Sequence, residues 1–140
     1  MLSATQALAD VADERAVRFC VAKDANFVKV DDCLPDAHVA FASFDAIHQI
    51  YGDAGQDLTS RCLEVNKGDY VGAATCGRTA IEAAINLAAK LPAGTEIPDP
   101  LFKALKNPAD MERLTSAIKS ARAVFPDKQF WGGGMYRPLK

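Results

Sequence analysis

The stretch that decides the fold is YVGAATCGRTAIEAAINLAAK, residues 70–90. It is rich in alanine, the strongest helix former, and its larger apolar residues recur every three or four positions. Leu91 continues this apolar face, and Pro92 and Gly94 end the helix just beyond it. The sequence therefore predicts one long helix over residues 70–90, whose small side chains allow a neighbouring helix to approach closely.

Two further helices are predicted before this one, over residues 4–22 and 36–51, each with an apolar stripe at helical spacing. The segment 24–35 contains no long periodic stretch and is predicted to be a connection. Asp36 is placed as the N-cap of the second helix, and Gly52 supplies its left-handed stop. These two helices are expected to pack as an antiparallel hairpin.

A second hairpin is predicted to follow, in which a short helix opens at Asp57 or Thr59 and ends before Gly68. It would pair with the helix at 70–90. No stretch shows the sustained alternation of a strand, so the predicted fold class is all-α. The expected organisation is a helical domain of residues 1–126, with helical hairpins at 4–51 and 57–91 and a final helix at 107–125, followed by an extended docking tail at 127–140.

The final helix has a strong start signal, because Asn107 is an N-cap residue and Pro108 sits at the first helical position. After it, residues 127–140 hold large apolar side chains around Gly132–Gly134, and three consecutive glycines do not form a stable helix. Apolar side chains beside a flexible hinge indicate a segment that docks on another protein. The alternative is a tail that folds back over its own bundle. The predicted docking residues are Phe130, Trp131, Met135 and Tyr136.

Composition excludes several classes of function. The chain has 16 Lys and Arg against 18 Asp and Glu, interleaved along the sequence, so it lacks the basic face of a nucleic-acid-binding protein. No apolar run approaches the roughly 20 residues needed to cross a bilayer. We therefore expect a protein that is peripheral to any membrane it serves. The N-terminal residues show neither a secretory apolar core nor an Arg-rich transit peptide.

Four cysteines, an even number, permit two disulfides or four buried thiols. None forms a Cys-x-x-Cys pair, which argues against zinc-ribbon and thioredoxin-like sites. In an oxidising compartment the local pairs are Cys20–Cys33 and Cys62–Cys76, and pairs between the two hairpins are their rivals.

No constellation of residues points to catalysis, a metal or a cofactor. His38 and His48 lie ten residues apart, on different faces of one predicted helix, so they are not a catalytic pair. The segment beginning at Asp24 superficially resembles a calcium loop but has Lys29 where that loop requires glycine. We therefore predict a protein that is not an enzyme and that binds no cofactor.

The stretch from Arg18 to Gly72 resembles a family of mitochondrial complex I accessory subunits, the PGIV or alpha-subcomplex subunit 8 type, which are double CHCH (coiled-coil-helix-coiled-coil-helix) proteins. In that family an alanine-rich helix with a Thr-Ser-Ala-like start leads to a cysteine and then to a segment like Asn-x-x-Phe-x-Lys-Cys. Here Ser3-Ala4 leads through an alanine-rich helix to Cys20, which is followed by Asp24-Ala25-Asn26-Phe27-Val28-Lys29. The second module of the family begins with a motif like Arg-Cys and then Tyr-Val-Gly, and this chain has Arg61-Cys62 and Tyr70-Val71-Gly72. The positions ten, twenty and thirty residues beyond Cys20 are Val30, Ala40 and Ile50, so the disulfide pairing of the family is not carried over.

The resemblance implies a non-catalytic structural subunit of NADH:ubiquinone oxidoreductase, in contact with other protein subunits. It would lie on the intermembrane-space face of the mitochondrial inner membrane and brace the membrane arm. One alternative is an extrinsic helical-bundle subunit of a photosystem or another membrane complex. Another is a small enzyme or redox carrier that uses Cys62 or Cys76, which would need an exposed cysteine with a lowered pKa.

Overall fold

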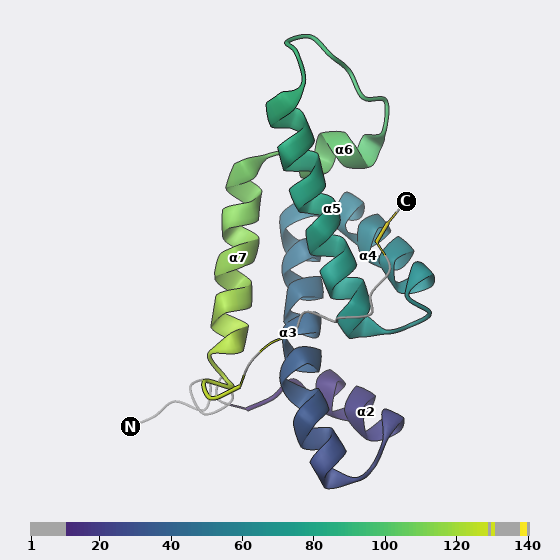
Figure 1. Cartoon of the computed structure of the whole chain (residues 1–140), viewed down its shortest axis with the longest axis vertical. Coiled ribbons are helices and arrows are strands. Elements are labelled where there is room, and N and C mark those ends of the chain that lie inside the picture. Colours follow the sequence, from purple (N-terminus) through teal and green to yellow (C-terminus); the bar gives the residue numbers. More distant parts are fainter. Residues whose placement is uncertain (1–10, 129, 131–137, 140) are drawn as a thin grey trace.

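A computed structural model describes residues 11–128, 130, 138 and 139 of the chain. These residues form six α-helices and no strand, so the all-α prediction is confirmed (Figure 1). The helices are α2 (Glu14–Lys23), α3 (Phe27–Tyr51), α4 (Asp53–Val65), α5 (Tyr70–Lys90), α6 (Pro100–Leu105) and α7 (Pro108–Arg122).

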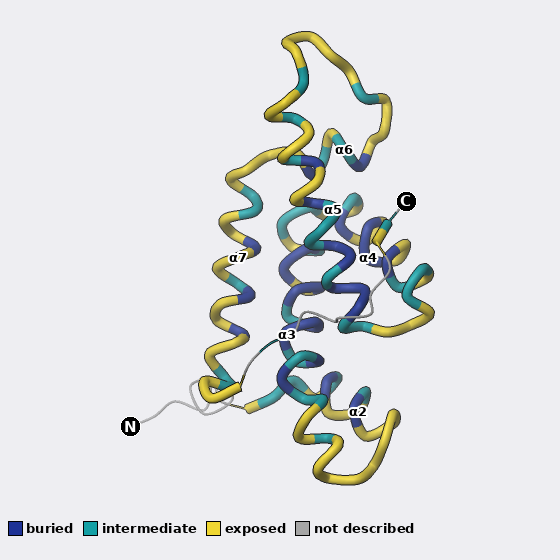
Figure 2. Tube along the Cα trace, viewed as in Figure 1, coloured by how far each residue is buried: buried dark blue, intermediate teal, exposed yellow. Residues whose placement is uncertain are grey.

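The long helix α3 is the centre of the molecule. It packs against α2, α4, α5 and α7, and Figure 1 shows α2 beside its N-terminal half and α7 running along it. Figure 2 shows buried residues gathered where α3, α4 and α5 face one another. Among the completely buried side chains of this core, the four largest each contribute roughly 1.5–3 kcal/mol through the hydrophobic effect. They are Ile47, Leu58, Ile81 and Leu114.

A smaller apolar cluster joins α2 to α3. Ala16 and Cys20 of α2 are buried against Ala37 and Phe41 of α3. The ring of Tyr70, at the start of α5, packs against both this cluster and the main core. Val71 does the same, and the Phe41 ring contacts Phe44 of the main core, so the two clusters are continuous. No helix in the described part of the chain is long and apolar enough to cross a membrane.

The first helix begins later than predicted. The helix expected over residues 4–22 is wrong within the described residues, because α2 starts at Glu14 and Asp13 is its N-cap. The Asp13 carboxylate accepts a hydrogen bond from the Arg15 backbone N–H at 2.8 Å. A side chain that caps the backbone in this way ends any helix approaching from the N-terminal side.

The largest error lies at residues 24–35, which were predicted to be a connection. Asn26 caps α3 through Val28 N–H, and the helix continues past Pro35 and Asp36 to Tyr51. Asp36 is therefore inside a helix and is not an N-cap. A proline inside a helix costs about 3 kcal/mol or more, because it lacks an N–H and its ring crowds the preceding turn. Burial of Pro35 and its neighbours, together with the disulfide at Cys33, offsets that cost.

The second half of the chain follows the prediction more closely. Helix α5 spans the predicted residues 70–90, and Gly52, with φ of +60°, ends α3 as expected. Helix α4 begins at Asp53, directly after that glycine, and not at Asp57 or Thr59. The final helix ends at Arg122, three residues earlier than predicted.

The proline-rich loop before the final helix contains a short helix that was not predicted. Asp99 caps α6 through the Leu101 N–H at 3.0 Å, and Pro100 occupies its first position. This is the same signal that correctly predicted the start at Asn107 and Pro108. Its six residues are too few to carry an apolar period, which is why it was overlooked.

Candidate functional site

Two disulfides cross-link the helical hairpins. Cys20–Cys33 joins α2 to α3, and Cys62–Cys76 joins α4 to α5. The predicted local pairs are therefore confirmed over the pairs between hairpins. Cys62 and Cys76 are completely buried and Cys20 nearly so, whereas Cys33 is half-buried. The redox or catalytic role considered for Cys62 or Cys76 requires an exposed thiolate, which a buried disulfide does not present.

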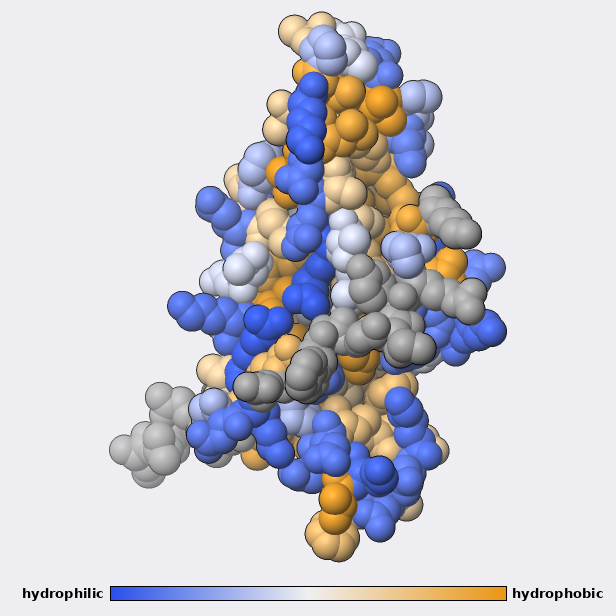
Figure 3. All heavy atoms as spheres, in the orientation of Figure 1, coloured by the Kyte–Doolittle hydropathy of each residue, from blue (hydrophilic) through white to orange (hydrophobic). Residues whose placement is uncertain are grey.

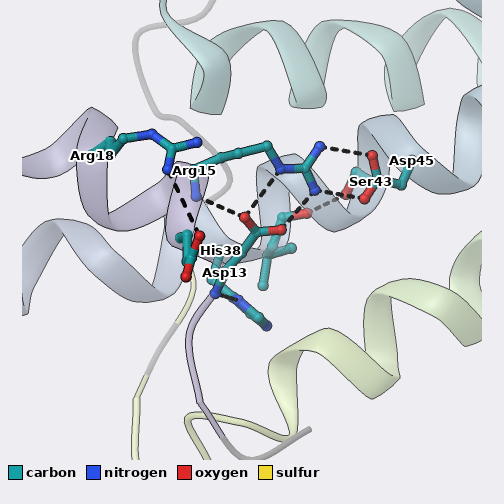
Figure 4. A network of polar contacts seen from close by, with 8 residues as sticks. Asp13, Arg15, Arg18, His38, Ser43 and Asp45 are labelled. Carbon is teal, nitrogen blue, oxygen red and sulfur yellow. Dashed lines mark hydrogen bonds and ion pairs between the residues drawn. The ribbon is translucent and has the colours of Figure 1, made fainter. Parts of the chain in front are cut away.

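A charged clamp reinforces the hairpin of α2 and α3. The Arg15 guanidinium donates to both carboxylate oxygens of Asp13, at 3.0 and 2.6 Å, and to both of Asp45, at 2.9 and 2.6 Å (Figure 4). It also lies 5.0 Å from the centre of the Phe41 ring. Hydrogen bonding from Arg15 lowers the pKa of Asp13, while the two carboxylates raise the pKa of Arg15. One side chain thus connects the start of α2 to the middle of α3.

His38 holds the residues that lead into α2. Its Nδ1 accepts the backbone N–H of Asp13 at 3.0 Å, so this nitrogen carries no proton and the ring is neutral (Figure 4). Burial lowers the pKa of His38, and its ring also packs edge-on against Phe125 at 5.5 Å. His38 is therefore a structural residue that links the chain before α2, helix α3 and the turn that follows α7.

His48 lies at a different place and has different partners. Its Nε2 is 2.7 Å from the Thr59 hydroxyl, which is itself within 3.1 Å of the Gly55 carbonyl oxygen. A hydroxyl has one proton to donate, and when Thr59 donates it to that carbonyl, His48 must be the donor in their bond. His38 and His48 do not share a site, as the sequence predicted. His48 lines a hollow of about 410 Å³ together with Phe41, Phe44 and Tyr70.

The end of the first hairpin exposes apolar side chains. Val21 is 45% exposed, Phe27 81% and Val28 51%, and we call these three residues the hairpin tip. Figure 3 shows hydrophobic atoms protruding at the lower end of the molecule, where the turn between α2 and α3 lies in Figure 1. A phenylalanine this exposed is unusual in a folded protein, and exposed apolar groups mark interaction sites when they gather.

The hairpin tip was missed because residues 24–35 were predicted to be a connection. The signal was present in Asn26, whose side chain accepts the Val28 N–H at 2.9 Å and so starts α3 at Phe27. In helical geometry the first residue of α3 projects away from the core. In an irregular loop, no such direction could be assigned to it.

The predicted docking tail is only partly described. Phe130 packs against the main core of its own bundle, and the Arg122 guanidinium lies 5.5 Å from the centre of its ring. Leu139 also packs against this core, in a groove beside α5 and α6. Trp131, Met135 and Tyr136 lie outside the described residues, so their docking role stays a prediction.

The described residues contain no cluster of three or more His, Cys, Asp or Glu side chains placed to hold a metal ion. Neither histidine has the arrangement of a nucleophile, a base and an orienting group that hydrolytic catalysis uses. The features that stand out are structural: two disulfides, the ion pairs of Arg15 with Asp13 and Asp45, and the exposed hairpin tip. In comparisons with known proteins, no family model, no curated protein and no solved structure matches this chain.

Proposed function

We propose that this protein is a non-catalytic structural subunit that docks on a larger protein assembly in an oxidising compartment. The observation that carries the proposal is the exposed Phe27 at the end of a hairpin closed by Cys20–Cys33. Two disulfides fit an oxidising compartment, because cytosolic proteins keep their thiols reduced. The docking partner is a protein with an apolar pocket large enough for an aromatic ring.

Rigidity is what makes the hairpin tip suited to docking. Burying a phenylalanine side chain contributes roughly 1.5–3 kcal/mol, but ordering a flexible segment on binding would consume much of that gain. Here Cys20–Cys33 and the clamp from Arg15 to Asp45 fix the hairpin before binding. The entropy cost of docking is therefore small. Aromatic anchors of this kind commonly dominate interface energies.

A narrower proposal is an accessory subunit of mitochondrial complex I on the intermembrane-space face. Its support is the resemblance over residues 18–72, together with the helical hairpins and their disulfides. Each hairpin carries one disulfide, whereas twin Cys-x9-Cys hairpins carry two. The intermembrane space is one of several oxidising compartments that the cross-links would suit.

A second candidate is an extrinsic subunit that reaches its compartment by the secretory route. The feature that favours it is the pair of disulfides, Cys20–Cys33 and Cys62–Cys76, because secreted and lumenal proteins fold in an oxidising compartment. Fractionation of the natural source distinguishes the two candidates, because the protein is recovered with mitochondria in the first case and with a secretory or lumenal compartment in the second.

The docking proposal is tested by isolating the native assembly with tagged versions of the protein and identifying its partners by mass spectrometry. The informative variant is Phe27→Ser, which removes the ring from a position where it contributes little to folding. Leu87→Ser on α5 is the matched control, because Leu87 is also exposed, at 40%, but lies far from the tip. We expect the Phe27 variant alone to lose its partners. Recovery of the same partners with both variants would refute docking through the tip.

A further inference from the structure

A groove lies between α3 and α7, beside the residues that lead into α2. It has a volume of about 540 Å³, and its lining is mostly apolar. Ala42 of α3 and Ala117 of α7 line it and are only partly buried, and Ala121 lies one turn further along α7. Val11, which precedes α2, also lines the groove. Apolar surface open to water is unfavourable, so a segment that covered this groove would stabilise the fold.

The backbone is fixed where it enters this groove. The Asp13 N–H donates to Nδ1 of His38 at 3.0 Å, which holds the chain before α2 against α3 (Figure 4). Asp13 also caps α2, so the residues before it do not continue that helix. Val11 is 55% exposed and lines the groove, so the chain that precedes Val11 starts at the groove itself.

The charged side chains of the lining already have partners. Asp13 pairs with Arg15 at 2.6 Å, and Glu14 is 93% exposed and lies 3.9 Å from Arg18. A neutral, apolar segment can therefore lie in the groove without leaving a buried charge unpaired.

The residues that precede Val11 have the composition of such a segment. Residues 1–10 lie outside the described part of the chain, and residues 2–9 read Leu-Ser-Ala-Thr-Gln-Ala-Leu-Ala, with no charged side chain. Leu8 is three residues before Val11, a stretch that reaches at most about 10 Å. Ala117 and Ala121 are about 6 Å apart along α7, so Leu8 has the reach to lie against both.

We propose that residues 2–9 of this chain dock in the groove between α3 and α7, with the Leu8 side chain packed against Ala42, Ala117 and Ala121. Because the segment is tethered at Val11, its effective concentration at the groove is in the millimolar range, and it loses no translational freedom on docking. A partner protein or a second copy would lack this advantage. Docking would tie α2, which packs mainly on α3, to α7 as well. The inference is independent of the docking of Phe27 on a partner.

The test is solution NMR of the full chain with assigned methyl groups. We expect nuclear Overhauser contacts from the Leu8 methyl groups to those of Ala117 and Ala121. Their absence in the folded protein would overturn the proposal. A mixed sample of isotope-labelled and unlabelled chains separates contacts within one copy from contacts between copies. Contacts seen only between copies would assign the groove to a second copy and would also overturn it.

Variants measure the effect on stability. Leu8→Ser should lower the melting temperature by about 4–10 °C, because it removes one docked leucine side chain. Phe27→Ser is the matched control and should leave the melting temperature unchanged, since Phe27 is 81% exposed. Ala117→Glu, which places a charge in the groove, should remove the contacts of Leu8. Combined with Leu8→Ser it should lower the melting temperature by less than the sum of the two separate losses. Additive losses would mean that the two residues do not meet.

Discussion

The two disulfides should respond very differently to a reductant under native conditions. The outer bridge, Cys20–Cys33, holds α2, which packs mainly on α3 and can open locally without disturbing the main core. The inner bridge, Cys62–Cys76, has both residues completely buried. A reductant reaches it only when the bundle itself unfolds. We therefore expect the outer bridge to be reduced first, giving a two-thiol intermediate with α3 to α7 still folded.

The size of the difference follows from the stability of the bundle. Each bridge closes a loop of similar length, with separations of 13 and 14 residues, and contributes about 3 kcal/mol in the chain-entropy model. A domain of this kind has about 5–15 kcal/mol of stability, so about 2–12 kcal/mol remain after the first reduction. Even at the lower limit of about 2 kcal/mol of remaining stability, only about one molecule in 30 is unfolded at any time. The inner bridge should thus be reduced at least about thirtyfold more slowly.

The assay is a time course with a phosphine reductant, quenched by alkylation and read by intact mass and peptide mapping. The expected intermediate carries two labels, on Cys20 and Cys33, and retains its helical circular dichroism. Two results would refute the reasoning. One is labelling of Cys62 and Cys76 first, and the other is direct conversion from no labels to four, which would mean that α2 does not open by itself.

Three further predictions concern packing, pH and the tail. Gly55→Ala should destabilise the fold by about 2 kcal/mol or more, because the added methyl would clash with the backbone carbonyl oxygen of Ile47. Gly77→Ala should lower the stability in urea far less, because its methyl would meet only the ends of two flexible side chains, Ile47 at 3.3 Å and Leu58 at 4.0 Å. Burial lowers the pKa of His38 below its usual 6.5, so the neutral ring stabilises the fold fully above about pH 6.5, and this stabilisation is lost as the pH falls through the lowered pKa. The melting temperature should therefore fall between pH 7.5 and 5. In the His38→Gln variant the melting temperature should depend less on pH over this range. Truncation after Lys128 removes Phe130 and Leu139, which pack on the core, so the melting temperature should fall while the helical circular dichroism persists. An unchanged melting temperature would show that the tail does not stabilise the fold.

Local signals in the sequence determined the helices that are defined by their own caps and periods. The helix at 70–90 needs no partner to be recognised, since alanine content and a regular apolar face both favour it. The start at Asn107 and Pro108 is equally local, because capping depends on residues two or three positions apart. The stop at Gly52 follows from the freedom of glycine to adopt positive φ. The all-α class followed from these elements alone.

Tertiary structure decided what depends on residues far apart in the chain. Residues 27–35 are helical despite Pro35, because the cross-link to Cys20 and burial against α2 outweigh the penalty of the proline. The choice between local and distant cysteine pairs was likewise open in the sequence, since pairing requires Cα atoms within about 7 Å. The fold brings both local pairs to 5.8 and 5.7 Å. The exposure of Phe27 is a property of the assembled surface, which local sequence does not encode.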